Sequence, residues 1–255
     1  MKTFLKIITL ALIMISCGRK EQKQEATIVT AAPVAETVML PQLTDQQKGE
    51  GWKLLFDGQT KDGWQIFKAR KNNTWEVKNG TLHAIALDET TKGVGDERSD
   101  IMTTGEYGNF ELTFDWKISP EGNSGVIFRA TEEFEQPYLS GPEYQIIDDK
   151  GYPGKLKDTQ LTGASYDMQV TKNASVNAVG EWNSSKIVAH GNHIEHWLNG
   201  AKVLEYELGS ADWKKRKAGS KWKDAKGYGL AKKGHIDFQD HGSEVWFKNI
   251  MIHEL

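Results

Sequence analysis

Hydrophobic and polar residues alternate along several short stretches of this chain. Between Asn109 and Ile118 every second residue is apolar, and the intervening residues are Glu, Thr, Asp and Lys. A period of two is typical of a β-strand that buries one face. The same reasoning predicts strands over residues 124–129, 143–148, 186–198, 235–239 and 245–253.

Turn signals separate these stretches, and no long segment has the period of an amphipathic helix. Asn79-Gly80 and Asn199-Gly200 each lie between apolar segments, which is the sequence pattern of a tight β-hairpin. Many short strands with turns between them predict an all-β fold, a sandwich or jelly roll of two packed antiparallel sheets. Residues 211–229 are expected to form an irregular excursion from that scaffold.

The N-terminal region predicts export and lipidation. Residues 1–16 carry two lysines, then an apolar run too short to cross a bilayer, then a small residue, as in a secretory signal peptide. Cys17, the one cysteine of the chain, follows directly and resembles the lipidated residue of a bacterial lipobox. The alternative is an ordinary signal peptide followed by an unrelated cysteine.

These features predict three parts: a signal peptide over residues 1–16, a flexible tether over residues 17–47 and one domain over residues 48–255. The mature protein is expected in the cell envelope, held to a bacterial membrane only by the lipid on Cys17, with its domain facing the periplasm or the exterior.

Composition narrows the range of partners. The chain has 38% hydrophobic residues and nine Trp, enough for a large core without disulfides. The net charge of −3 gives no general attraction to nucleic acid. The one basic cluster, residues 214–223, is flanked by Asp212 and Asp224, so a solvated loop is expected there and no nucleic-acid partner.

Polar side chains repeat on one face of three predicted strands. If those strands share a sheet, the side chains converge on a concave surface. The alternative is that they simply face water, as outer strand faces commonly do. The chain contains no Walker A loop, HExxH helix or CxxC pair. The converging candidates are Arg129, Glu143, Gln145, His235, Asp237, Gln239 and His241.

Aromatic residues accompany these polar groups in loops and at strand ends. Flat rings beside paired hydrogen-bonding groups suit sugars, whose C–H faces stack while their hydroxyls bind polar side chains. A role in the core or in a covering loop is the alternative for each ring. The residues are Tyr138, Tyr152, Tyr166 and Trp182.

An ordered series of short motifs runs from Trp52 to Leu255. It includes Leu55-Phe56-Asp57-Gly58, Tyr107-Gly108-Asn109-Phe110, Asn123-Ser124-Gly125, Glu143-Tyr144-Gln145-Ile146, Thr162-Gly163-Ala164-Ser165-Tyr166, Glu181-Trp182-Asn183, Phe238-Gln239-Asp240-His241-Gly242 and Phe247-Lys248-Asn249-Ile250. In this series the chain resembles the 3-keto-disaccharide hydrolase family, with Lys248 where that family usually has Arg. The resemblance implies a concanavalin-like jelly roll that acts on small carbohydrates, namely glycosides whose C3 hydroxyl has been oxidised to a ketone.

Chemistry at such a ketone needs three kinds of group. The ketone acidifies the hydrogen on C2, so a base can remove it, the C1 substituent departs, and water then adds at C1. A base, a stabiliser of the enolate oxygen and an acid near the glycosidic oxygen are required. We expect Glu143 or His241 as the base, Arg129 and Gln145 at the enolate or neighbouring hydroxyls, and Tyr166 or His241 at the leaving group.

The remaining candidates concern substrate binding and metal. Gln239, Trp182, Asn183 and Asp148 are expected to bind substrate. No cofactor is certain, but a divalent ion held by His241, Glu143 and Asp148 could replace Arg129 as the electrophile.

Three other functions stay open. An ordinary glycosidase with two carboxylates is one, although the Glu-x-Asp-x-x-Glu pattern is missing from the sequence. A non-catalytic carbohydrate-binding lipoprotein of the same fold is another. The third is an adhesion module with calcium at Asp148, Asp149 and Asp158, whose spacing matches no familiar calcium loop. Activity on unoxidised disaccharides, or binding without turnover, distinguishes the first two from the keto-specific enzyme.

Overall fold

The structure is a computed structural model, and it describes residues 38–71, 74–86 and 98–255. The predicted signal peptide, Cys17 and the tether up to residue 37 lie outside the described residues. In the described ranges, no helix has both the length and the apolar character needed to cross a membrane.

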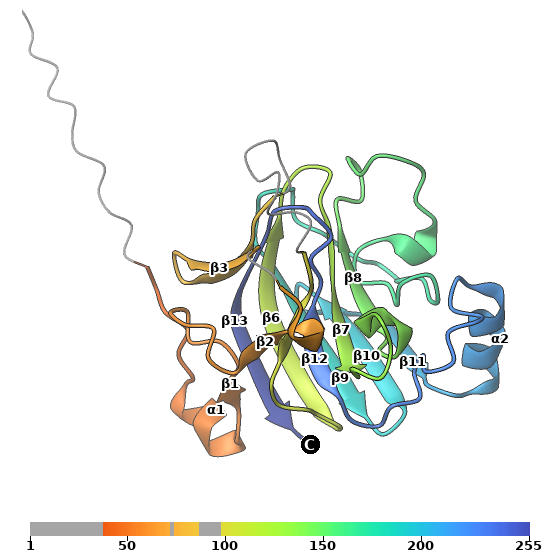
Figure 1. Cartoon of the computed structure of the whole chain (residues 1–255), viewed down its shortest axis with the longest axis horizontal. Coiled ribbons are helices and arrows are strands. Elements are labelled where there is room, and N and C mark those ends of the chain that lie inside the picture. The colour runs from red at the N-terminus through yellow and green to blue at the C-terminus, as the bar shows by residue number, and fades with distance from the viewer. Residues whose placement is uncertain (1–37, 72–73, 87–97) are drawn as a thin grey trace, which may run out of the picture. The chain divides into compact units, whose positions relative to one another are not determined.

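The larger of two antiparallel sheets has the strand order β11-β10-β9-β6-β13-β4-β3, and β1 also pairs with β13 (Figure 1). Its strands are β1 (Lys53–Leu54), β3 (Trp75–Lys78), β4 (Thr81–Ala84), β6 (Phe110–Ile118), β9 (Asn183–His190), β10 (His193–Leu198), β11 (Ala201–Glu207) and β13 (Val245–Glu254). The predicted alternation in β6 is confirmed, because buried and half-buried residues follow one another along its whole length.

The smaller sheet has the order β2-β5-β12-β7-β8. Its strands are β2 (Trp64–Ile66), β5 (Ile101–Thr103), β7 (Asn123–Ala130), β8 (Glu143–Ile147) and β12 (His235–Phe238). The two sheets pack face to face, as predicted for a jelly-roll sandwich.

Aromatic rings fill the space between the sheets. Phe238 of the small sheet lies edge-on to Phe247 and Phe114 of the large sheet, with ring centroids 4.5 and 5.8 Å apart. Tyr144 of the small sheet reaches across to Ser185 of the large one, with the two hydroxyl oxygens 2.9 Å apart. Each such ring contributes about 1.5–3 kcal/mol through burial, so this layer holds the sandwich together.

The Asn-Gly turns lie where the sequence predicts them, at Asn79-Gly80 between β3 and β4 and at Asn199-Gly200 between β10 and β11. The single strand predicted over residues 186–198 is wrong. Gly191, with φ of 60°, turns the chain there, and β9 pairs with β10 as a further hairpin. The flanking residues are polar on both sides, so the alternation does not reveal the turn.

The helical elements lie outside the two sheets: α1 (Asp45–Glu50), α2 (Ala211–Gly219) and the 3-10 turns η1 (Phe67–Ala69), η3 (Pro137–Leu139) and η4 (Asp158–Gln160). A capping box at Thr44 begins α1, since Thr44 Oγ1 accepts from the Gln47 amide and Gln47 Oε1 from the Thr44 amide. The compact unit spans Val38–Leu255. The domain predicted from the sequence, residues 48–255, lies within it. The segment predicted to be irregular, residues 211–229, begins with α2.

Candidate active site

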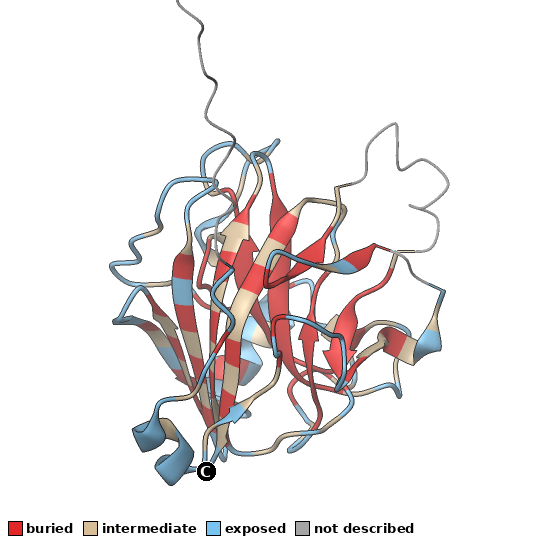
Figure 2. Ribbon diagram, turned by 90° about the vertical axis from the view of Figure 1, so that its left-hand side faces the viewer, coloured by how far each residue is buried: buried red, intermediate tan, exposed pale blue. Residues whose placement is uncertain are grey.

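The outer face of the small sheet, which points away from the large sheet, is covered by protein. All residues of β5, β7, β8 and β12 are buried, and Figure 2 shows these strands continuously red where strands of the large sheet alternate in colour. Because the Tyr144 hydroxyl reaches the large sheet, its neighbours Glu143 and Gln145 point to this outer face. These polar groups are therefore buried rather than solvated.

A pocket of about 150 Å³ lies on this outer face. The start of β7, the strand β8, the segment after β12 and three covering segments supply its walls. The lining residues are Asn123, Glu143, Gln145, Gln239, His241, Tyr138, Tyr166 and Lys221. The structure thus brings together six of the residues singled out from the sequence: Glu143, His241, Tyr138, Tyr166, Gln145 and Gln239.

A glycine under the pocket makes room for the buried carboxyl. Gly125 of β7 pairs with Gln145 of β8, and a Cβ atom at Gly125 would lie 2.5 Å from Oε1 of Glu143. The Glu143 carboxyl therefore lies directly over the bare backbone of Gly125. The glycine is needed for this close approach and not for its backbone conformation, since its φ lies outside the left-handed region.

Replacing Gly125 with Ala should displace the Glu143 carboxyl. We expect turnover to fall about 100-fold, because Glu143 is one of the two residues expected as the base, and a shift of about 1 Å in a reacting group has that effect. Overpacking should lower the free energy of unfolding by about 1–3 kcal/mol. Kinetics and urea denaturation measure both effects. Gly49→Ala in α1, where nothing lies within 4 Å of the added methyl group, is the matched control. Unchanged turnover in G125A would show that the position of Glu143 is immaterial.

The environment of Glu143 favours its protonated form. Burial raises the pKa of Glu143 to about 8, the Lys221 charge opposes this, and the Asp100 charge adds to it. The side-chain amide of Gln145 lies between Glu143 and Asn123. In one orientation its nitrogen donates to Asn123 Oδ1 at 3.2 Å, and in the other it donates to Glu143 Oε1 at 3.0 Å. Gln145 can thus accept from a protonated Glu143 or donate to an ionised one.

Two more carboxyls lie buried on the same face of the sheet. Asp237 of β12 has no exposed surface, and neither of its oxygens has a well-formed hydrogen bond within the described ranges. Burial, then the charges of Asp100 and Glu143, raise the pKa of Asp237 well above its ordinary value. Burial also raises the pKa of Asp100 to about 7, although its Oδ1 accepts the backbone amide of Asp240 at 2.8 Å.

These shifts predict a stability that falls as pH rises. In the folded protein Asp237 keeps its proton, whereas in the unfolded chain it loses this proton above about pH 4. The native state therefore binds more protons than the unfolded state, and the free energy of unfolding decreases as pH rises. Each unit of raised pKa corresponds to about 1.4 kcal/mol. Asp237→Asn should therefore match the wild type near pH 4 and exceed its stability at pH 8. Urea denaturation at pH 4, 6 and 8 tests this, with exposed Asp62→Asn as the control. A variant less stable than wild type at pH 8 would contradict a protonated Asp237.

Arg129 does not reach the pocket. It is an extra residue in β7, because Phe128 pairs with Ile236 and Ala130 with His235, and its φ is 53°. Its Nε and Nη2 donate to the carbonyl oxygen of Gly108 at 2.9 and 2.7 Å, and Nη1 donates to that of Gly191 at 2.9 Å. The guanidinium is buried and bound to backbone, so we assign it no part in the reaction.

Three predicted substrate-binding residues also lie away from the pocket lining. Asp148 accepts the backbone amides of Glu121, Lys150 and Gly151 in a loop, so the predicted metal set is reduced to Glu143 and His241 at the pocket. The Trp182 ring lies 4.0 Å from the Lys248 ammonium.

Asn183 holds the chain near the Asn199-Gly200 turn. Its Oδ1 accepts from the Asn177 amide and from Asn199 Nδ2, both at 2.9 Å. In this structure Asn183 therefore has a structural role at the turn, although it belongs to the motif of residues 181–183.

The sequence reasoning missed Lys221 and Asn123 as lining residues. Lys221 was placed in a solvated basic loop, but the residues after it form part of an aromatic stack. Trp222 stacks on Tyr228, with ring centroids 4.7 Å apart, and its Nε1 donates to the Tyr166 carbonyl at 2.8 Å. The aromatic residues within this basic segment indicate that the loop packs against the domain, and the sequence reasoning did not use them.

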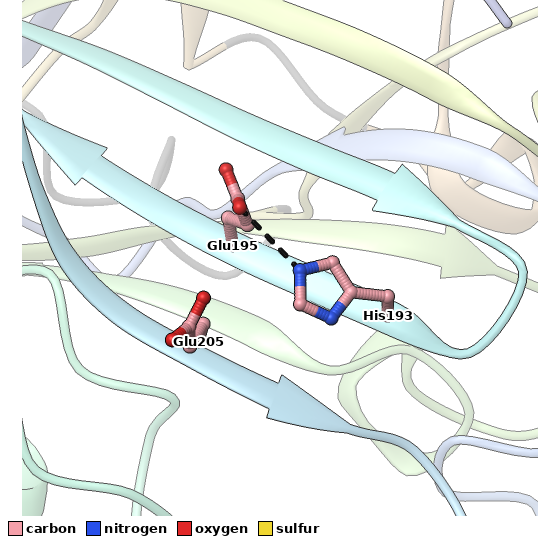
Figure 3. Close-up of side chains that lie close together, drawn as sticks. All are labelled: His193, Glu195 and Glu205. Carbon is pink, nitrogen blue, oxygen red and sulfur yellow. Dashed lines mark hydrogen bonds and ion pairs between the residues drawn. The ribbon is translucent and has the colours of Figure 1, made fainter.

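A second ionisable cluster lies on β10 and β11 of the large sheet (Figure 3). Ligand-type atoms of His193, Glu195 and Glu205 lie within 4.8 Å of one another. The Lys202 ammonium lies 3.0 Å from a Glu195 oxygen and also binds Glu205 at 2.5 Å, and His193 Nδ1 lies 2.7 Å from Glu207 Oε1. Opposite charges thus already balance one another in this half-exposed network.

Comparison with known proteins identifies relatives along almost the whole chain. The family described as the 3-keto-alpha-glucoside-1,2-lyase-like domain matches residues 51–253. A 3-keto-disaccharide hydrolase of Bacteroides thetaiotaomicron is 30% identical, over 94% of this chain and 93% of that protein. A candidate glycosyl hydrolase of Parabacteroides distasonis has a solved structure with 39% identity and a TM-score of 0.77, covering 85% of this chain and all of that one. A second from that organism has 29% identity and a TM-score of 0.60, with 80% and 99% covered.

Proposed function

The chain belongs to the family of 3-keto-alpha-glucoside-1,2-lyase-like domains, and from this premise we propose that its pocket cleaves glycosides whose C3 hydroxyl has been oxidised to a ketone. Its similarity to these relatives indicates a hydrolase that acts on carbohydrate. The observation that supports the proposal is the Glu143 carboxyl, buried over Gly125 at a small polar pocket and carrying a pKa of about 8. A base with a pKa near the working pH is suited to removing a proton from carbon next to a ketone.

The reaction has two stages. Glu143 takes the proton from C2, and the electrons of the C2–H bond form the enolate. When the C3 carbonyl re-forms, the enolate electrons make a C1=C2 double bond conjugated to the ketone, and the C1 substituent departs with its bonding electrons. The departing oxygen needs a proton, and Tyr166 lines the same pocket. Burial raises the pKa of Tyr166, so its phenol stays a hydrogen-bond donor near neutral pH.

Hydration then completes the cleavage. Water adds to C1 and passes one proton to the group that protonated the departing oxygen, Tyr166 or His241. The protonated Glu143 returns its proton to C2, which gives a free 3-keto sugar. His241 is exposed and also lines the pocket, where it can assist the departing oxygen or the incoming water. Gln145, Gln239 and Asn123 supply amide groups for the sugar hydroxyls.

Time-resolved NMR of the protein with 3-keto-trehalose and, separately, trehalose tests the proposal, each with and without a chelator. Release of glucose and a 3-keto sugar from the first alone is the expected result. Loss of activity under chelation would add a divalent metal to the mechanism. Cleavage of trehalose would favour a glycosidase with two carboxylates. Binding without turnover of either sugar would favour a carbohydrate-binding protein.

A further inference from the structure

Lys221 is held at the wall of the pocket by its backbone and by its neighbour in sequence. It follows Ser220, the C-terminal cap of α2, and its amide donates to Asp167 Oδ2 at 2.8 Å. The adjacent Trp222 is bound to the Tyr166 carbonyl, so both residues are attached to the loop that carries Tyr166. The covering segment thus places a cation at the pocket although it lies far along the chain from β7 and β8.

Aromatic faces position the Lys221 ammonium without using its hydrogen-bond donors. Its Nζ lies 3.9 Å from the ring centroid of Tyr166 and 4.4 Å from that of Trp222. Across the described segments, no carboxylate oxygen lies within 4.0 Å of this nitrogen, unlike the ammonium of Lys202, which binds two carboxylates. The three N–H donors are therefore available to a bound molecule.

The proposed reaction places negative charge where such a cation is useful. Removal of the C2 proton by Glu143 moves an electron pair onto the C3 oxygen, one carbon away from the site of proton transfer. The residue first expected at this oxygen, Arg129, is bound to backbone carbonyls elsewhere. Lys221 is the one Lys or Arg among the lining residues, all of which belong to the described part of the chain.

We propose that Lys221 binds the C3 carbonyl oxygen of the substrate and stabilises the enolate, which makes it the residue that selects 3-keto sugars over 3-hydroxy sugars. This inference rests on the proposed function. A 3-hydroxyl group forms no enolate and gains much less from a nearby ammonium, so the cation favours the oxidised substrate in the transition state. The charges of Glu143 and Lys221 also stabilise one another, since the ionised carboxyl opposes the lowering of the Lys221 pKa by burial.

The test separates proton removal from cleavage. In deuterium oxide, 1,5-anhydro-3-keto-glucitol has no leaving group at C1, so exchange of its C2 proton, followed by NMR, reports enolate formation alone. We expect Lys221→Met to slow both this exchange and the turnover of 3-keto-trehalose by about 100- to 1,000-fold, as for loss of one oxyanion donor. Lys221→Arg should recover part of both rates. Lys223→Met, two residues away, exposed like Lys221 but outside the pocket lining, is the matched control and should equal the wild type.

The outcomes distinguish the two proposals. If the wild type neither exchanges the C2 proton nor cleaves 3-keto-trehalose, the proposed function is wrong. If the wild type does both and K221M exchanges at the wild-type rate, only the role of Lys221 is wrong. To exclude a folding effect, ethylamine is added to Lys221→Ala. Partial recovery of exchange supports the role, while no recovery in a variant with wild-type thermal stability counts against it.

Discussion

Replacing Glu143 with Gln should lower the turnover of a 3-keto-glucoside by about 100- to 10,000-fold, because an amide cannot accept the proton from C2. Gln has nearly the same shape and can keep the contacts with Gln145, so the pocket should retain its form. The wild-type kcat/KM should rise with pH and level off above about pH 8, since the base acts only when ionised. In E143Q this rise should disappear. Measuring kcat/KM between pH 5.5 and 9.5 checks both points.

His241→Asn, measured beside E143Q, shows which of the two residues is the base. His241 was the other base expected from the sequence, but it lies exposed in the pocket lining whereas Glu143 is buried. We expect H241N to lower turnover less than E143Q and to leave the rise near pH 8 in place. If H241N removes that rise and E143Q retains it, the base is His241 and the assignment to Glu143 is wrong.

Replacing Arg129 with Met should destabilise the fold without a specific effect on the reaction. The carbonyl oxygens of Gly108 and Gly191 would lose the buried donors that now bind them, and each unsatisfied group costs about 1–3 kcal/mol. We expect the free energy of unfolding to fall by about 2–5 kcal/mol in urea denaturation, with kcat of the remaining folded protein close to that of the wild type.

Arg216→Met provides the control for Arg129. Arg216 lies on α2 in an exposed ion pair with Asp212, so its loss should change stability by no more than about 0.5 kcal/mol. An Arg129→Met protein that is as stable as the wild type but inactive would show that Arg129 takes part in catalysis.

The strands were predictable because each buries one face over many residues. Alternation gives the core strand β6 almost to the residue, and the shared faces of residues 143–145 and 237–239 place Glu143, Gln145 and Gln239 together. Arg129 was misassigned because a bulge breaks the alternation at that residue, and nothing in the local sequence specifies a φ of 53° there.

Lys221 shows a different limit of the sequence. Its position depends on an aromatic stack and on two hydrogen bonds to the loop of residues 166–167, which are contacts between segments more than fifty residues apart. Periodicity reports which face of an element is buried, but it carries no information on which covering segment packs over that face.

The position of β13 in the large sheet has a consequence for biosynthesis. β13 lies between β6 and β4, yet it is the last strand of that sheet to be synthesised. While residues 245–254 are still within the ribosome, β3 and β4 have no partner that joins them to β6, and both halves of the sheet present unpaired edges. We therefore expect the domain to complete its fold only after release of the whole segment, and nascent chains stalled before that point to be cleaved readily by protease.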